Sequence, residues 1–354
     1  MVTKKNIVLT KQEIFIKLAG DAKPFVLTAL AQNPEIDNEI QSILLKGQSG
    51  GALRGLAMNP SVTNESIVAL VKIIETDEDL RSYVIQGFFS NTKLPKHVVN
   101  LITSSDYSSS DFMAIKSKAL SAPEKQVCLK RMITKDAYET VLQDAAACDA
   151  LEEKQIEFLL THEAEDIRAE LARNPIISEA TQLILSKDKS TIVRKRLASN
   201  PVLCAKLEGP LSKDKEDDVK YCLIQNLRSR TPKVANKNAK VNYLKALKNG
   251  DDKELIKLGL DPNTPPDIIE QLCAKYYPAF DNWVSVALAQ NPKISMDRLS
   301  DISKSKNLEV LKALTTNALV TLEILTALSK NKDYQVRGVV ANPGFYELPT
   351  FMLS

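Results

Sequence analysis

The chain has 354 residues, of which 44% are hydrophobic and only 5% aromatic, and its 47 Lys and Arg side chains nearly balance 44 Asp and Glu. This is ample material for a core of Leu, Ile, Val and Ala, and the charge balance gives no general attraction to nucleic acid or membranes. No segment reaches the roughly 18 apolar residues of a membrane span, and the five cysteines include no C-x-x-C pair, so we expect a cytoplasmic protein with buried, reduced thiols.

A short phrase recurs from one end of the chain to the other. It reads Ala-Leu-Ala-Gln-Asn-Pro at 29–34 and returns unchanged at 287–292. Six of the eleven spacings between successive copies are 26 residues, which predicts a structural repeat. Each copy is anchored by its Asn, or by the residue in that place, and the twelve anchors are Asn33, Asn59, Asn91, Ala122, Cys148, Asn174, Asn200, Asn226, Asp261, Asn291, Asn317 and Asn342.

Each part of the phrase has a physical meaning. The residues before the anchor are apolar at spacings of three and four, as at 192–198, which predicts a helix. Asn tolerates the conformation that ends a helix, and the Pro after it forbids continuation. A capping residue such as Thr63 or Ser178 then starts a second helix. We further hypothesise that the Asn amides bond to the backbone of adjacent repeats and form a ladder.

Each repeat is therefore a pair of short helices, which cannot bury its apolar stripe alone and must stack on its neighbours. The predicted fold is an all-α solenoid of about twelve two-helix repeats of roughly 26 residues. With helix layers about 8–10 Å apart, one elongated, curved rod on the order of 100–120 Å long is expected over 1–354.

The predicted array divides by regularity along the chain. The divisions are N-terminal repeats at 1–91, divergent repeats at 92–150, regular repeats at 151–226, extended repeats with basic and aromatic insertions at 227–290, and C-terminal repeats with a cap at 291–354. The cap would be the apolar run at 345–353, which covers the last repeat or, alternatively, docks on another subunit.

The repeat from Asn226 to Asp261 spans 35 residues and carries a basic stretch without an acidic residue from 227 to 249. One interpretation is a solvated loop and helix face. The other is a contact for an anionic partner, either an acidic protein surface or a nucleic-acid backbone. The candidate residues are Arg228, Arg230, Lys233, Lys237, Lys240, Lys245 and Lys248.

The next repeat concentrates aromatic residues, including the only Trp, within eight positions. Such a cluster serves either as an interface anchor or as packing between a long turn and the solenoid. As candidate partner-binding residues it supplies Tyr276, Tyr277, Phe280 and Trp283.

The segments 193–201 and 336–343 carry the phrase V-R-x-x-L-A-x-N-P or a close variant. This phrase resembles the leucine-rich repeat variant family, a relative of HEAT repeats. The resemblance covers nearly the whole chain, fades between about 92 and 150, and implies a right-handed superhelix of alternating helices. Some members of that family carry an iron–sulfur cluster held by cysteines near the N-terminus, but this chain has no cysteine before Cys128.

The sequence announces no catalytic site, metal site or cofactor. Its two histidines, His97 and His162, lie 65 residues apart, and no phosphate-binding glycine loop is present. We therefore expect a non-enzymatic scaffold that binds a protein or peptide along one face of the solenoid. The alternative is a nucleic-acid-binding solenoid that uses the basic stretch.

Overall fold

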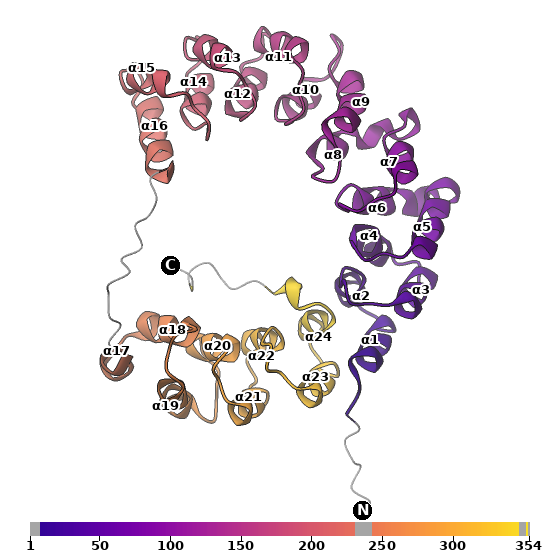
Figure 1. Ribbon diagram of the computed structural model, residues 1–354, viewed down its shortest axis with the longest axis vertical. Coiled ribbons are helices and arrows are strands. Elements are labelled where there is room, and N and C mark those ends of the chain that lie inside the picture. The colour runs from indigo at the N-terminus through magenta and orange to yellow at the C-terminus, as the bar shows by residue number, and fades with distance from the viewer. Residues whose placement is uncertain (1–7, 231–242, 347–351, 353–354) are drawn as a thin grey trace, which may run out of the picture. The chain divides into compact units, whose positions relative to one another are not determined.

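The structure, a computed structural model, describes residues 8–230, 243–346 and 352 (Figure 1). Within these residues it contains 24 α-helices, three short 3₁₀ helices and no strand, which confirms the predicted all-α repeat fold. None of the described helices is both long and apolar enough to cross a bilayer. The chain forms two compact units, one of 88–237 and one that combines 1–87 with 238–354.

The unit of 88–237, called the middle unit here, follows the chain order. Its first helices, those that end at an anchor, pack in succession, and the second helices form a layer beside them. The first helices are α8 (Asp111–Lys116), α10 (Glu139–Ala146), α12 (Glu165–Arg173), α14 (Thr191–Ala198) and α16 (Asp217–Arg230). The second layer holds α7 (Lys96–Ile102), α9 (Ala122–Met132), α11 (Glu153–Leu160), α13 (Glu179–Leu185), α15 (Glu208–Ser212) and the 3₁₀ helices η1 (Ser105–Ser110) and η2 (Ala205–Leu207).

The other unit, called the terminal unit here, is built from both ends of the chain. Its first helices are α18 (Asp252–Leu260), α20 (Trp283–Gln290), α22 (Leu308–Thr315), α24 (Tyr334–Ala341), α2 (Pro24–Ala31), α4 (Gly50–Met58) and α6 (Glu78–Phe88). The remaining helices are α17 (Tyr243–Asn249), α19 (Pro266–Tyr276), α21 (Met296–Ile302), α23 (Leu322–Leu328), α1 (Lys11–Ala19), α3 (Asn38–Lys46), α5 (Asn64–Thr76) and η3 (Pro343–Phe345).

Six of the anchor asparagines form the predicted ladder of amide hydrogen bonds. The Asn200 Nδ2 donates to the carbonyl oxygens of Ala172 and Asn174, both at 2.9 Å, and its Oδ1 accepts from the Val202 backbone N–H. Asn226 repeats the pattern on Ala198 and Asn200. The same pair of hydrogen bonds from Nδ2 to two carbonyl oxygens is made by Asn59, Asn174, Asn291 and Asn317. Each buried amide thus joins one repeat to the end of the preceding first helix.

One predicted anchor, Ala122, needs correction. Ala122 and Pro123 open α9, because Pro is favoured in the first turn of a helix, where its missing N–H is not needed. The rung is supplied by Ser117, whose hydroxyl donates to the Phe89 carbonyl and accepts from the Ala119 N–H. Cys148 does stand at a rung, with its Sγ 3.5 Å from the Ile115 carbonyl oxygen.

The two ends of the chain together complete one repeat. Among the described residues, the first α-helix along the chain is α1, a second helix of a repeat, and the last is α24, a first helix. In the structure α1 packs on α24, α23 and α2, so it takes the place of the second helix that should follow α24. Figure 1 shows α24 beside α2, continuing the row of first helices from the C-terminal repeats into the N-terminal repeats. We call the α24–α1 pair the composite repeat.

The contacts at this junction are of the kind found between consecutive repeats. The Asn33 Nδ2 donates to the Ala341 carbonyl oxygen at 2.7 Å, as a ladder amide does. At the start of α1, the Leu9 N–H donates to the Thr326 hydroxyl at 3.0 Å. Thr10 caps α1 with a capping box to Glu13, the same start that other second helices have. The ends are therefore joined by regular repeat stacking.

The prediction of one elongated, curved rod did not include this junction. Of the C-terminal run, Phe345 lies edge-on to Phe25 with ring centroids 5.6 Å apart, and α24 packs on α1 and α2 as well as on the 3₁₀ helix η3. The reason is physical: an exposed first-helix face is apolar, and the equally apolar face of the N-terminal repeat fits it. Most of the run at 345–353 lies outside the described residues.

The close approach of α6 to α4 gives a first prediction. A Cβ on Gly87 would lie 2.4 Å from the carbonyl oxygen of Arg54 and 2.5 Å from the Ala57 Cβ, so the two helices would have to shift apart. We expect Gly87→Ala to lower the free energy of unfolding by about 2–3 kcal/mol, as overpacking does. Gly209→Ala is the matched control, because nothing lies within 4 Å of its Cβ position. Urea unfolding midpoints compare the two, and equal midpoints would contradict the close packing.

Candidate partner-binding face

Large apolar side chains stand at the N-terminal ends of the first helices in the terminal unit. They occupy one of the first residues of α20, α22, α24 and α2, and on α6 one lies in the same position relative to the anchor. Each is 36–43% exposed, and together we call them the apolar row: Trp283, Leu308, Tyr334, Phe25 and Tyr83.

The row is continuous across the junction of the two chain ends. Phe25 of α2 meets Tyr334 of α24 edge to face, with ring centroids 5.8 Å apart. Gly338 of α24 makes room for this ring, because a Cβ there would clash with Phe25. Two aromatic residues more than 300 positions apart in sequence therefore form the centre of one surface.

At α4 the row passes over a glycine. A Cβ on Gly50, the first residue of α4, would lie 2.9 Å from the Tyr83 ring, so the ring of Tyr83 covers the start of this helix. Glycine is required here by the close approach of the ring, since no side chain would fit beneath it. The row thus extends over the starts of neighbouring first helices from α20 to α6.

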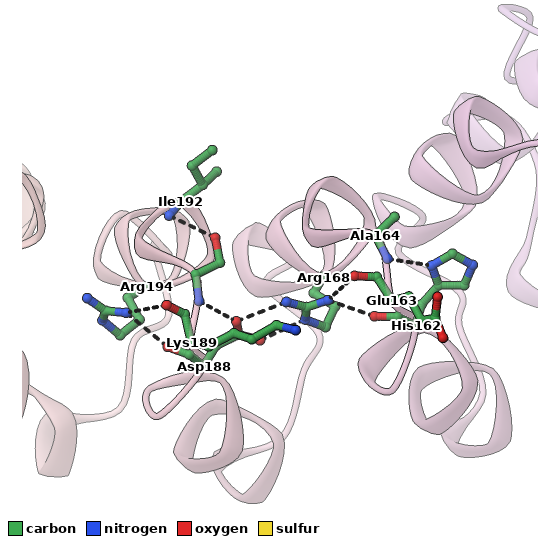
Figure 2. A network of polar contacts seen from close by, with 9 residues as sticks. His162, Glu163, Ala164, Arg168, Asp188, Lys189, Ile192 and Arg194 are labelled. Carbon is green, nitrogen blue, oxygen red and sulfur yellow. Dashed lines mark hydrogen bonds and ion pairs between the residues drawn. The ribbon is translucent and has the colours of Figure 1, made fainter.

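Pairs of Arg and Asp hold the starts of first helices in place. In the middle unit, Arg168 donates to both carboxylate oxygens of Asp188, at 2.7 and 3.0 Å, and to the carbonyls of His162 and Glu163 (Figure 2). Arg194 binds Asp214 in the same way, one repeat further on. Figure 2 also shows Arg194 reaching the Asp188 and Lys189 carbonyls, so each arginine ties its own turn to the next.

The electrostatics of these pairs follow from their geometry. Hydrogen bonds from Arg194 hold the pKa of Asp214 below its usual value. Burial would raise the pKa of Asp188, but its hydrogen bonds from Arg168 and the Ser190 N–H outweigh that effect, and the net pKa is lowered. Both carboxylates are therefore ionised at neutral pH, and each ion pair is two-pronged and largely shielded from water.

The same device closes the junction under the apolar row. Arg337 of α24 donates to both carboxylate oxygens of Asp21, at 2.5 and 3.0 Å, and to the carbonyls of Asn331 and Lys332. Asp21 lies in the turn before α2, and Arg337 is one helical turn from Tyr334. This pair therefore fixes Tyr334 and Phe25 against each other.

The predicted aromatic cluster is only partly a surface. Trp283 belongs to the apolar row, and Tyr277 is 55% exposed, with the Arg298 guanidinium over its ring at 5.9 Å. Tyr276 is half-buried and Phe280 is completely buried, so packing describes Phe280 better than partner binding. The turn folds inward because the Ser305 hydroxyl holds the Phe280 carbonyl at 2.7 Å.

The basic stretch is described only at its two ends. Lys233, Lys237 and Lys240 lie outside the described residues, while Lys245 and Lys248 are exposed on α17 and Arg228 lies in α16. Arg230 has a structural task instead: its guanidinium donates to the carbonyls of Asn200 and Leu203 and to the Asn226 Oδ1. Arg230 therefore covers the end of the Asn ladder in the middle unit.

Three side chains of the kinds that catalysis often uses, Cys128, Cys273 and His162, are engaged in the fold. Burial raises the pKa of Cys128 and of Cys273 to about 12, so both thiols are protonated and unreactive at neutral pH. The His162 Nδ1 accepts a hydrogen bond from the Ala164 N–H at the turn before α12. Among the described residues, His, Cys, Asp and Glu side chains do not gather into a group of three that could hold a metal ion.

Fold and site together define an all-α repeat protein with an apolar row on its first helices. No family model and no curated protein matches the chain, so the resemblance to leucine-rich repeat variant proteins stays a prediction. Among solved structures, an engineered protein from the Northeast Structural Genomics Consortium is similar at 13% identity and a TM-score of 0.20, over 96% of this chain and 100% of its own. A likeness at that TM-score carries no argument about function.

The sequence contained a signal for the row that composition and local clusters do not reveal. Phe25, Tyr83, Trp283 and Tyr334 all stand eight residues before an anchor asparagine. Aligning the repeats on their anchors would have placed these aromatics on one face, although the neighbourhood of α24 and α2 could not be read from the alignment.

Proposed function

We propose that this protein is a non-enzymatic scaffold that binds a protein or peptide segment along the apolar row. The observation that carries the proposal is the row itself. Single exposed apolar side chains are ordinary on protein surfaces, but a contiguous set on successive packed helices is typical of a binding surface. Two aromatic rings at its centre are held rigidly by the Arg337–Asp21 pair, which lowers the entropy lost on binding.

The row is accessible yet well supported from below. The residues that follow it in each helix, such as Val26, Val284 and Val336, are fully or almost fully buried and pack the helix on its neighbours. A partner would therefore meet side chains whose backbone does not need to rearrange. Aromatic residues in such settings carry much of the binding free energy at interfaces. Of the seven residues that the nucleic-acid alternative would use, Lys233, Lys237 and Lys240 lie outside the described residues, and Arg230 is bound to backbone carbonyls.

Selection of binders from a displayed library of random peptides tests this proposal. The double variant Leu308→Ser with Tyr334→Ser removes two row residues, and Val68→Ser with Tyr138→Ser removes two equally or more exposed apolar residues elsewhere. We expect selected peptides to lose roughly tenfold or more in affinity for the row variant, since truncating an anchor costs about 1–2 kcal/mol or more. Affinity for the control variant should change little.

The measurement is the dissociation constant of each selected peptide for the three proteins, with unfolding midpoints to check that the variants are folded. Peptides that bind the row variant and the unchanged protein equally well would overturn the proposal, whatever their sequence.

A further inference from the structure

The turns beside the centre of the apolar row are rich in lysine. They precede α22, α24 and α2, and their lysine side chains are all exposed: Lys304, Lys306, Lys330, Lys332 and Lys23. The two aspartates in the turns before α24 and α2 are already occupied. Asp21 is bound by Arg337, and the Asp333 carboxylate caps α24 by accepting from the Gln335 N–H. Lys304 is paired with Asp301 at 3.1 Å, so the excess positive charge of the rim comes from Lys306, Lys330, Lys332 and Lys23.

A hollow at the junction concentrates this charge. It has a volume of ≈570 Å³ and lies between the end of α1 and the turns before α2 and α24, lined among others by Lys17, Lys23, Lys330 and Arg337. Asp21 is the only carboxylate among its lining residues, and it is neutralised by Arg337. Burial, and then the charge of Lys330, lower the pKa of Lys17, as expected where like charges lie close together.

The spacing of the row limits the shape of what can lie on it. Packed helices are about 8–10 Å apart, so the row side chains leave successive helices at about that interval, although the Phe25 and Tyr334 rings meet at 5.8 Å. A peptide in the polyproline II conformation has three residues per turn and advances about 3.1 Å per residue, so every third side chain lies on one face and reaches the next helix of the row. The residues between would meet the lysine rim on one side.

We propose that the apolar row binds an acidic peptide segment in a polyproline II conformation, with an apolar side chain at about every third position and carboxylates between. This inference rests on the proposed function and adds the chemistry of the partner. The charge of the rim selects carboxylates, and the row selects apolar anchors. Because α22 and α24 come from one end of the chain and α2 from the other, the bound segment bridges the two ends and stabilises the composite repeat.

A synthetic probe tests the chemistry directly. A fluorescein-labelled peptide of five Phe-Glu-Glu units is titrated with the full chain, and binding is followed by fluorescence anisotropy. The triple variant Lys306→Glu, Lys330→Glu and Lys332→Glu reverses the rim, and Lys72→Glu, Lys275→Glu and Lys293→Glu makes the same charge change at other exposed lysines of the terminal unit. We expect the rim variant to weaken binding roughly tenfold or more, and the control variant only a few-fold, because charge acts mainly at short range in salt.

Two further peptides complete the test. Replacing Glu by Lys in the probe should abolish binding to the unchanged protein, and replacing Phe by Gly should weaken it at least as much as reversal of the rim. Equal binding of the Lys peptide, or equal loss in the rim and control variants, would overturn the inference.

The failures of the two proposals are distinguishable. If the affinity of selected peptides depends on Leu308 and Tyr334 but is the same for the rim variant and the unchanged protein, the proposal of an acidic partner is wrong and the scaffold function stands. If no peptide depends on the row, both fall. Hydrogen exchange supplies the remaining readout: the probe should slow exchange in α24 and α2 together, and slowing in only one of them would contradict the bridge.

Discussion

Replacing Asn200 by Ala is expected to lower the free energy of unfolding of the middle unit by about 3 kcal/mol or more. The Asn200 side chain is completely buried and makes three hydrogen bonds, two as donor to the Ala172 and Asn174 carbonyls and one as acceptor from the Val202 N–H. Alanine leaves these backbone groups without the amide, in a place that water does not reach. Each such group costs about 1–3 kcal/mol.

Urea unfolding, followed by circular dichroism, measures the loss. Ser199→Ala is the matched control, since Ser199 is the exposed neighbour at the same helix end and bonds only within its own turn. We expect Ser199→Ala to change the free energy of unfolding by no more than about 0.5 kcal/mol. A loss for Asn200→Ala no larger than for the control would mean that the ladder does not hold the repeats together.

Much of the fold could be predicted because the repeat is marked locally. The Asn-Pro step, the cap three or four residues later and the apolar spacing each depend on a few neighbouring residues, so they can be read from one sequence. Ser117 was not predicted as an anchor, because a hydroxyl can replace the amide as donor and acceptor and no Pro follows it to mark the end of the helix. The Ala122–Pro123 step misled because Pro marks helix starts as well as helix ends.

The junction of the chain ends could not be predicted from the count of repeats, because periodicity says which repeats are alike and not which are adjacent. One sign was present, however. The first cap that the sequence marks, at Thr10 and Glu13, starts a second helix of a repeat, and α24, the last α-helix of the described residues, is a first helix. A composite repeat needs one half of each type.

The candidate site shows the same limit. Trp283 was identified because it stands in a local aromatic cluster, whereas Phe25 and Tyr334 are isolated in sequence and meet only in the folded unit. Phe280 was selected for the same local reason, but its turn folds inward and its ring is buried. Local composition therefore finds aromatic residues without telling which way they point.

Replacing Arg337 by Ala is expected to lower the free energy of unfolding by about 3 kcal/mol, and Arg194→Ala in the middle unit is expected to lower it by a similar amount. Each change removes the guanidinium from a largely buried carboxylate, Asp21 or Asp214, and leaves that charge without its partner. The comparison asks whether the junction of the chain ends is as strong as stacking between repeats that are consecutive in sequence. Urea unfolding at neutral pH measures both losses, and the cycle with Asp21→Ala isolates the pair.

The contribution of the Arg337–Asp21 pair to stability depends on pH. The pKa of Asp21 is lowered in the folded protein, because the Arg337 hydrogen bond and the Lys23 N–H outweigh the effect of burial. The stabilisation is therefore fully present above the ordinary Asp pKa of about 3.9 and is lost as the pH falls through the lower folded value. The difference in the free energy of unfolding between the unchanged protein and Arg337→Ala should shrink over that acidic range.

The comparison with Arg194→Ala also shows how strong the junction is. If Arg337→Ala speeds hydrogen exchange only in α1 and α24 and leaves the urea midpoint unchanged, while Arg194→Ala lowers that midpoint, then the composite repeat is a loose contact between chain ends. The bridge that we propose for a bound acidic segment would then have to close the junction by itself, and its stabilising effect on α24 and α2 should be correspondingly larger.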